Sequence, residues 1–299
     1  MANPIQHYRD IKFDYGRCEQ VSPLLRRVIA ENPTPFTFHG TGTYIIGQGN
    51  VAIVDPGPDI PKHVDAIFKA LKGETITHIL ITHTHSDHSP ATRRVKAVVD
   101  VPAYGFGPHG QYGPKVEEGP DYDFTPDVFL KDGDVVEGDG WTVEAVHTPG
   151  HTSNHLCFAL KEEKALLSGD HIMGWSTTVV SPPDGSMHEY IESLKKVRDR
   201  NEDIIWPTHG PPITDPNAYV TQLIDHRAER EMEILSCLQN DIGLIPDMVE
   251  VIYANVPQRL HRAAGRSVYA HLIHMVKTKR VACDNEPSPD SQYRLPNNA

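Results

Sequence analysis

Residues 76–90 read ITHILITHTHSDHSP, and this stretch decides how the chain is interpreted. Its first seven residues favour a buried strand. The next six, His83-Thr84-His85-Ser86-Asp87-His88, carry four side chains that can bind a metal ion. On a loop between a strand and a helix, such side chains can diverge toward two neighbouring ions. The alternative is a polar loop whose histidines cap the helix that follows.

Three further turns weaken that alternative. Each follows a β-like run and carries a ligand-type residue: Thr148-Pro149-Gly150-His151, Ser168-Gly169-Asp170-His171 and Pro207-Thr208-His209-Gly210. Loop residues at the ends of strands can converge at one edge of a sheet. Together with the 83–88 loop, these turns supply enough donors to surround two metal ions.

Composition excludes several classes of protein. The 299 residues contain 28 Lys and Arg against 40 Asp and Glu, a net charge of -12 that argues against a general polyanion binder. The four cysteines form no CxxC pair and suggest neither a disulfide framework nor a thiolate zinc module. The chain also shows no apolar run of about 18 residues. We therefore expect a cytoplasmic protein with no membrane partner.

Periodicity predicts two strand-rich blocks, each accompanied by helices. The first block has strands in 36–47, 50–54 and 76–82, with helices over 61–73 and 90–99; the second has strands in 134–146, 155–161, 164–170 and 204–206, with a helix over 187–200. Pro90 and Ser89 predict the start of the 90–99 helix, and Ser186 with Glu189 is spaced as a capping box. Such blocks indicate packed sheets with helices outside.

The character of the chain changes to helical from Asp215 onward. We expect a hydrolase domain over 1–215, a helical domain over 216–282 and a loose polar tail over 283–299. The apolar stripe of the helix that begins at Pro216 could pack on the first domain or on a second subunit, so a homodimer stays open.

The order HxHxDH, PGH, GD and THG resembles the metallo-β-lactamase superfamily over about residues 30–215. The resemblance implies an αββα sandwich. It also implies two metal ions. One would be held by His83, His85 and His151, the other by Asp87, His88 and His209, and Asp170 would bridge both.

Two zinc ions, or manganese or iron in their place, can share a hydroxide that attacks an ester, amide or phosphodiester. Catalysis would rest on Asp170 and on Asp87, which can also orient the hydroxide. A bridging Asp170 resembles the thioesterase, lactonase and nuclease branches more than the β-lactamases that place Cys there. Asp55 is either a turn residue or an acceptor for the N–H of a ligand imidazole.

A closer resemblance, to the β-lactamase-like protein 2 subgroup and its bacterial relatives, extends over most of the chain. It is carried by NPTPFTFHGTGTYIIG, SGDHIMGWSTTVV, EYIESL, WPTHGPPI and DHRAEREMEIL. It implies a small C-terminal winged-helix-like domain, and members cleave either polyketide thioesters or single-stranded RNA. Gly42, where the subgroup pattern has Asn, and the SPPDGS insertion at 181–186 depart from the pattern near the expected cleft.

Further residues are substrate-site candidates. Thr177 and Thr178, in WSTTVV, either donate hydrogen bonds to substrate or are simply strand formers. Arg259, Arg262 and Arg266 lie in a segment, 257–280, with six Lys and Arg and no acidic residue. They either face an anionic substrate or form a solvated basic face.

These observations favour a dinuclear zinc hydrolase acting on a small ester, thioester or lactone. The first alternative is a metal-dependent endoribonuclease on single-stranded RNA. Promiscuous β-lactam hydrolysis and a catalytically idle, metal-stabilised interaction protein rank lower. The sequence leaves open the natural substrate, the metal, the proton donor to the leaving group and the oligomeric state.

Overall fold

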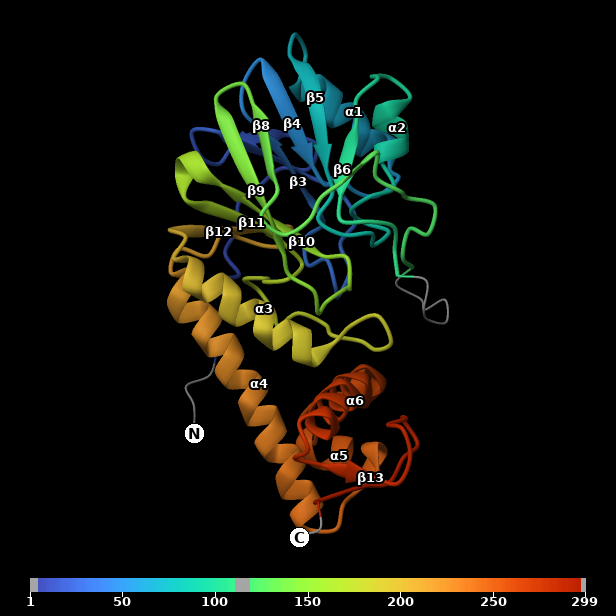
Figure 1. Ribbon diagram of the computed structural model, residues 1–299. Coiled ribbons are helices and arrows are strands. Elements are labelled where there is room, and N and C mark those ends of the chain that lie inside the picture. Colours follow the sequence, from blue (N-terminus) through green and yellow to red (C-terminus); the bar gives the residue numbers. More distant parts are fainter. Residues whose placement is uncertain (1–4, 111–118, 297–299) are drawn as a thin grey trace.

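The computed structural model describes residues 5–110 and 119–296, apart from the side chain of Arg259. Two β-sheets stack face to face, and helices cover their outer faces (Figure 1). Below this sandwich, a long helix leads to a smaller C-terminal group of helices. The arrangement is the αββα sandwich with an appended C-terminal domain that the sequence predicts.

The first sheet has seven strands, which lie side by side in sequence order. They are β1 (Cys18–Gln20), β2 (Leu25–Ile29), β3 (Gly42–Ile46), β4 (Asn50–Val54), β5 (Thr75–Leu80), β6 (Ala103–Gly105) and β7 (Val128–Phe129). Pairing is antiparallel from β1 to β4 and parallel from β4 to β7. The parallel strands therefore end at the same edge, where the 83–88 loop follows β5.

The second sheet has five strands. Their order is β12 (Ile204–Pro207), β11 (Ala165–Gly169), β10 (Leu156–Leu160), β9 (Trp141–His147) and β8 (Val135–Gly138). Only the pair β11 and β12 is parallel. The turns before β10 and after β11 and β12 carry the other predicted metal-binding residues.

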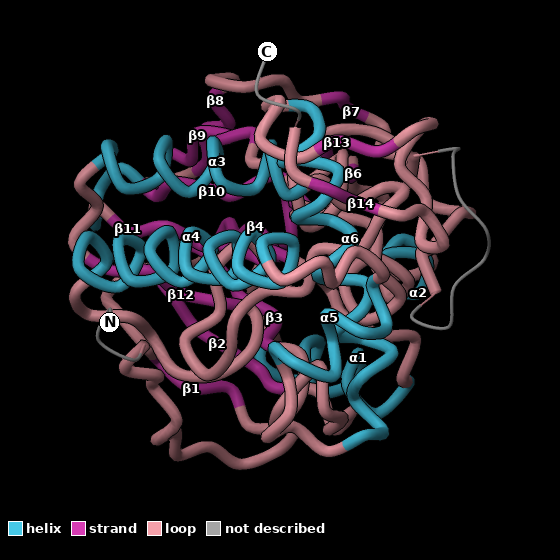
Figure 2. The backbone as a smooth tube through the Cα atoms, turned by 90° about the horizontal axis from the view of Figure 1, so that it is seen from below, coloured by secondary structure: helices cyan, strands magenta, loops and turns pink. Residues whose placement is uncertain are grey.

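The helices are α1 (Pro61–Ala70), α2 (Thr92–Lys96), α3 (Met187–Arg200), α4 (Pro216–Gln239), α5 (Ile245–Ile252) and α6 (His261–Lys277), with short 3-10 turns η1 (Lys161–Glu163) and η2 (Gln258–Leu260). Helix α3 begins as predicted, because the Ser186 side chain accepts a hydrogen bond from the Glu189 N–H. Asp215 caps α4 in the same way. Figure 2 shows α3 and α4 side by side across the sandwich.

Three apolar layers hold the sandwich together. Alternate residues of each strand face opposite layers: in β10, Leu156, Phe158 and Leu160 pack between the sheets, whereas Cys157 and Ala159 face α3 and α4. A third layer packs the first sheet on α1 and α2. Every residue of β10 is buried, so the strand reads as a continuous apolar run.

The C-terminal domain has an apolar core of its own, which includes Met248, Leu272 and Tyr293. Tyr293 belongs to β14 (Tyr293–Arg294), which pairs with β13 (Ala282–Cys283). The sequence-based expectation of a loose tail is therefore wrong for this part of the chain. The polar 283–299 segment offers few apolar side chains, chiefly Tyr293 and Leu295, and only packing reveals that Tyr293 is buried in the domain core.

Several predicted elements differ from the observed ones. Residues 36–41 form a turn and loop, and only the second half of the predicted 36–47 strand is β3. Helix α2 begins at Thr92 without a side-chain cap, because the Ser89 hydroxyl donates instead to Asp121. Residues 175–180 form no strand, and β1 and β2 were not predicted. Within residues 5–110 and 119–296, no helix is long and apolar enough to span a membrane.

Candidate metal centre

Seven histidine and aspartate side chains converge where the strands of the two sheets end. They form two groups whose potential ligand atoms lie within 4.8 Å of one another: His83, His85, His151 and Asp170, and Asp87, His88 and His209. Both sets match the grouping that the sequence resemblance implies. Four loops from the two sheets contribute, which explains why the residues are spread over more than a hundred positions.

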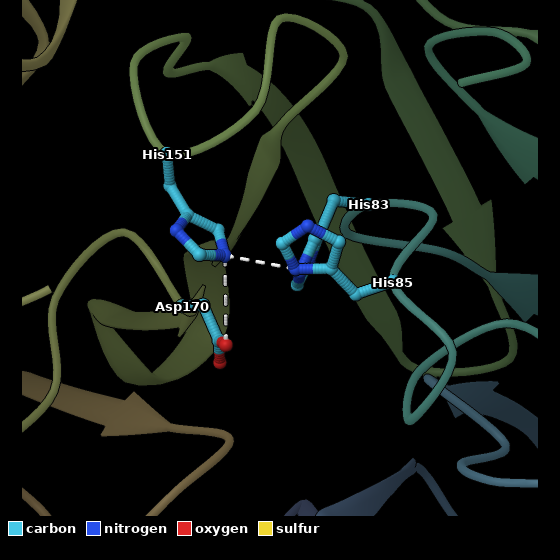
Figure 3. Close-up of side chains that lie close together, drawn as sticks. All are labelled: His83, His85, His151 and Asp170. Carbon is cyan, nitrogen blue, oxygen red and sulfur yellow. Dashed lines mark hydrogen bonds and ion pairs between the residues drawn. The ribbon is translucent and has the colours of Figure 1, made fainter. Parts of the chain in front are cut away.

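The first group gathers three imidazoles around one point. Nδ1 of His85 lies 3.0 Å from Nε2 of His83 and 3.0 Å from Nε2 of His151. Figure 3 shows His151 on one loop facing His83 and His85, with Asp170 beside them. Three nitrogens converging at this separation are typical of ligands that share a metal ion about 2 Å away.

Asp170 lies between the two groups. Its Oδ2 is 3.8 Å from Nε2 of His151, whereas its Oδ1 is 3.5 Å from Nε2 of His88 and 3.3 Å from Nε2 of His209. Asp87 Oδ2 completes the second group, 3.4 Å from Nε2 of His88 and 3.3 Å from Nε2 of His209. One carboxylate thus presents a different oxygen to each group, as a bridging ligand does.

The backbone turns sharply at Asp55, at the end of β4, and the Asp55 side chain fixes two of these imidazoles. It is 1% exposed, and its Oδ2 accepts hydrogen bonds from His88 Nδ1 at 2.8 Å and from the Thr82 hydroxyl at 2.7 Å. Since the Thr82 hydroxyl donates to Asp55, it accepts from His83 Nδ1 at 3.1 Å. The Nε2 atoms of His83 and His88 therefore point toward the metal groups. Asp55 thus acts as an acceptor for the N–H of a ligand imidazole, one of the two roles considered for it.

Backbone carbonyls orient two other imidazoles. Nδ1 of His151 contacts the Val179 carbonyl at 2.7 Å, and Nδ1 of His209 contacts the Gly40 carbonyl at 3.1 Å. Gly40 has φ of +132°, and a Cβ there would lie 2.0 Å from the Ala30 carbonyl, so only glycine fits. The loop before β3 therefore belongs to the site although it holds none of the seven residues.

Two more side chains hold Asp87 and Asp170 in place, one through a carboxylate and the other through the backbone. The Thr41 hydroxyl donates to Asp87 Oδ2 at 2.9 Å. Nε2 of His155 accepts from the Asp170 N–H at 3.2 Å, so the ring donates from Nδ1 to the Thr148 hydroxyl. Neither contact leaves a spacing signal, so the sequence does not identify Thr41 and His155 as residues of the site.

The unpartnered atoms and the charges of the site fit divalent cations. His88 Nε2 and Asp170 Oδ1 are buried, and within the described chain neither has a hydrogen-bond partner. Burial lowers the pKa of His85 to about 3, so its lone pair is free for a metal. Burial also opposes charge on His209, yet Asp170 and Asp87 outweigh it and raise the pKa of His209 to about 10. The carboxylates thus favour positive charge at this point.

A cavity of about 610 Å³ opens from the first group toward the C-terminal domain. His85 and His151 form its inner end. Its far side, here called the C-terminal wall, consists of Ile252, Tyr253, Val256, Leu260, Ala263, Ala264, Arg266 and Ser267. The 181–186 insertion contributes Ser181 to Asp184, so this departure from the subgroup pattern does lie at the cavity, whereas Gly42 is buried in β3 and is not among the lining residues.

The other predicted substrate residues fall in different places. Thr177 and Thr178 both line the cavity, but the Thr178 hydroxyl already donates to the carbonyls of Asp170 and His171. Arg266 lines the cavity, whereas Arg262 is exposed and does not. The side chain of Arg259 lies outside the described part of the chain.

Other histidines and cysteines near the centre have structural contacts. Nε2 of His147 contacts the Ser153 carbonyl, and the ring stacks on Phe106. His171 packs edge-on against Tyr190 and belongs to neither metal group. Cys157 is fully buried, and burial raises the pKa of its thiol to about 12, so it packs as a small apolar residue.

Comparison with known proteins agrees with this geometry. The metallo-beta-lactamase superfamily matches residues 37–209, and the beta-lactamase associated winged helix domain matches residues 245–286. A beta-lactamase-like protein 2 homolog from Caenorhabditis elegans is 34% identical, covering 84% of this chain and 83% of that protein. An atrochrysone carboxyl ACP thioesterase from Aspergillus terreus is 32% identical, covering 78% of this chain and 70% of that protein.

A solved structure reproduces the whole architecture. A beta-lactamase domain protein from Burkholderia ambifaria superposes with a TM-score of 0.79 over 96% of each chain, at 21% identity. The shared fold therefore includes the C-terminal domain as well as the sandwich. The chain belongs to the metallo-β-lactamase superfamily of metal-dependent hydrolases and carries the associated winged helix domain at its C-terminus.

Proposed function

We propose that this protein is a dinuclear zinc hydrolase that cleaves a small acyl ester, thioester or lactone bound in the cavity between the metal groups and the C-terminal wall. The observation that carries the proposal is the composition of that cavity. It begins at His85 and His151 and continues along apolar side chains such as Val180, Val256 and Leu260. A cavity with metal-binding residues at one end and apolar side chains along the rest fits a substrate with a reactive carbonyl at the end of an acyl chain.

The seven residues of the two metal groups would hold the ions. When bound, two zinc ions polarise the scissile carbonyl and make a water molecule a strong nucleophile near neutral pH. Asp170, whose backbone is anchored by His155, would hold both ions in register. Asp87, fixed by the Thr41 hydroxyl, would orient the attacking water through its carboxylate. Because these groups are buried, few other water molecules can reach the reacting centre.

The relatives support the acyl class. Fungal proteins named atrochrysone carboxyl ACP thioesterases are 32% and 33% identical to this chain. A thioester places an electrophilic carbonyl between an acyl part and a thiol leaving group, and the cavity offers separate apolar and polar surfaces for such parts. We therefore place thioesters first among the acyl substrates.

A substrate panel at defined metal content tests the proposal. The zinc-loaded protein is assayed with acyl thioesters of increasing chain length, with lactones, with a β-lactam and with unstructured RNA. We expect thioester or lactone hydrolysis to show the highest kcat/KM, and to rise with acyl length. No turnover of any acyl compound by protein with two zinc ions bound would overturn it.

Single-stranded RNA is the second candidate, because three arginines line the cavity. Two of them have contacts within the protein: Arg227 donates to the Thr178 carbonyl and lies over Tyr190, and Arg230 pairs with Glu233. Within the described chain, no carboxylate lies close enough to Arg266 for an ion pair. Arg266 is thus the residue best placed to meet an anion.

Arg266→Ala, with Arg262→Ala as the exposed control, separates the two substrate classes. If RNA is the substrate, the first variant should weaken RNA binding and reduce the salt dependence of the affinity by about one counterion, while the second changes little. If an acyl compound is the substrate, binding of RNA by the unchanged protein should be weak and identical in both variants.

A further inference from the structure

His109 lies in the wall of the cavity but belongs to neither metal group. It follows β6 in a loop and is 9% exposed. Its ring centroid is 6.1 Å from that of His85, and Tyr122 packs edge-on against it at 5.4 Å. The cavity therefore offers an imidazole that faces the reaction space without being needed to hold a metal.

The orientation of this ring is set by a neighbouring amide. Asn154 Nδ2 lies 3.1 Å from the Gly107 carbonyl and 3.3 Å from the Pro108 carbonyl, and its Oδ1 accepts from the Thr152 hydroxyl at 3.0 Å. The flipped amide would place an oxygen against two carbonyl oxygens. The nitrogen must therefore be where the structure has it, and it also donates to the Thr84 hydroxyl oxygen at 2.9 Å.

The Thr84 hydroxyl determines which ring nitrogen of His109 carries the proton. Its side chain is 1% exposed, and its hydroxyl lies 2.9 Å from Nδ1 of His109. Asn154 donates to this hydroxyl and cannot accept from it. Because a buried hydroxyl proton without an acceptor is costly, Thr84 donates to Nδ1 of His109. Nδ1 is then an acceptor, and the neutral imidazole carries its proton on Nε2.

Within residues 5–110 and 119–296, the Nε2–H group of His109 has no hydrogen-bond acceptor. Its neighbour Asp184 has a carboxylate oxygen 3.8 Å away, which is beyond hydrogen-bond range. Both oxygens of Asp184 are already engaged, one by the Ser153 hydroxyl at 2.6 Å and the other by the Ser153 N–H at 3.0 Å. A fixed N–H donor thus lines the cavity next to the metal groups.

We propose that His109 donates a hydrogen bond from Nε2 to an oxygen of the acyl substrate, and that Thr84 and Asn154 are positioning residues that hold the ring in the required tautomer. This inference rests on the proposed acyl hydrolase function. The step moves no proton and needs no charge on the ring. A donor fixed before the substrate arrives stabilises the substrate oxygen without rearrangement.

Two substitutions of His109 distinguish the roles of the two ring nitrogens. His109→Gln places an amide N–H near the position of Nε2, whereas His109→Asn places its amide near Nδ1 and leaves the Nε2 position without a donor. We expect His109→Asn to lose about 2- to 12-fold in kcat/KM, the effect of one net hydrogen bond, and His109→Gln to retain most activity. Equal activity in both, at equal zinc content and melting temperature, would overturn the role.

Long-range proton–nitrogen NMR on the zinc-loaded, ¹⁵N-labelled protein tests the tautomer without catalysis. We expect the Nε2–H form of His109 in the unchanged protein and a mixture of tautomers in Thr84→Val. A medium-chain carboxylate, added as a product analogue, should shift the Nε2–H resonance. An Nδ1–H form, or no shift on saturation with the carboxylate, contradicts the proposal.

The two experiments also distinguish the failures. Absence of all acyl hydrolysis, together with the Nε2–H form and a carboxylate-dependent shift, would reject the proposed function and keep His109 as a ligand donor. Normal hydrolysis with the wrong tautomer would reject the His109 inference alone.

Discussion

The metal groups and the C-terminal wall face each other across one cavity, yet they are built in opposite ways. Four imidazoles of the metal groups have their second ring nitrogen bonded to another group of the protein, for example His88 to Asp55 and His151 to the Val179 carbonyl. The wall is mainly apolar, and its polar member Arg266 is partly exposed. The chemistry is therefore rigidly fixed, whereas the surface that contacts the rest of a substrate is loosely specified.

This difference implies a division of labour. Changes in the metal groups should affect every substrate alike, because they alter the reacting centre. Changes in the C-terminal wall should alter the ratio between substrates and leave metal binding intact. Three predictions test this difference and a fourth tests the contacts between the two domains, in order of decreasing effect.

The largest effect is expected for Asp170→Ala. It removes the carboxylate that faces both groups. Loss of a residue that only supports a metal ligand typically lowers activity about 10- to 100-fold, and we expect a larger loss here, for every substrate. The zinc content per chain should also fall, as measured by atomic emission. Asp203→Ala, an exposed aspartate before β12, is the control and should match the unchanged protein. Full activity of Asp170→Ala would refute the bridging role.

A smaller effect is expected for Asp55→Asn. The amide has one acceptor oxygen in place of two, so it cannot serve the Thr82 N–H, the Thr82 hydroxyl and His88 together. Zinc affinity, measured by competition with a chelator, should fall about 10- to 100-fold. Asp59→Asn, at an exposed site four residues away, should leave the affinity unchanged. Equal affinities in the two variants would remove Asp55 from the site.

The third prediction concerns the C-terminal wall. Ala263→Phe would fill part of the cavity, so kcat/KM for long acyl thioesters should fall at least about 10-fold relative to short ones, with zinc affinity unchanged. Arg262→Phe adds the same ring to the exposed neighbour, which does not line the cavity. An equal loss for short and long substrates would contradict the proposed division.

The smallest effect is expected from pH, through contacts between the two domains. His274 of α6 stacks on His188 of α3 and lies 3.6 Å from Glu231. Burial is the largest influence on the pKa of His274 and lowers it; Glu231, the next largest, opposes this shift, and Arg280 and His188 add to it. Because the folded-state pKa lies below the unfolded one, the unfolded chain binds more protons below about pH 6.5.

Stability should therefore fall as the pH drops from 7.5 to 5.5, and fall less in His274→Phe, which keeps an aromatic ring in the stack. Melting temperatures of the zinc-free proteins at the two pH values measure this. His261→Phe, in the same helix, is the control. The same pH dependence in all three proteins would show that His274 is not responsible.

Much of the fold could be predicted from local pattern. The bounds of α3 follow from its apolar stripe and the Ser186 cap. The four metal-binding side chains of 83–88 follow from residue type and spacing, whereas their division between two groups was implied by the family resemblance. Strands β1 and β2 were not predicted from the sequence, because CEQ is short and polar and two arginines interrupt the apolar residues of LRRVI. These strands exist because β3 provides a pairing edge, which is a tertiary condition.

The sequence by itself determined which residue types could bind metal and that each lies on a turn after or before a strand, since covalent spacing and strand propensity fix both. Only the tertiary structure decided which ring nitrogen faces the centre and that Thr41 bonds the Asp87 carboxylate while His155 bonds the Asp170 backbone. It also decided that His109 keeps a donor without an acceptor in the described part of the chain. These features depend on hydrogen bonds between loops far apart in the chain, for example Asn154 to Thr84. Packing sets such contacts, and no short motif encodes them.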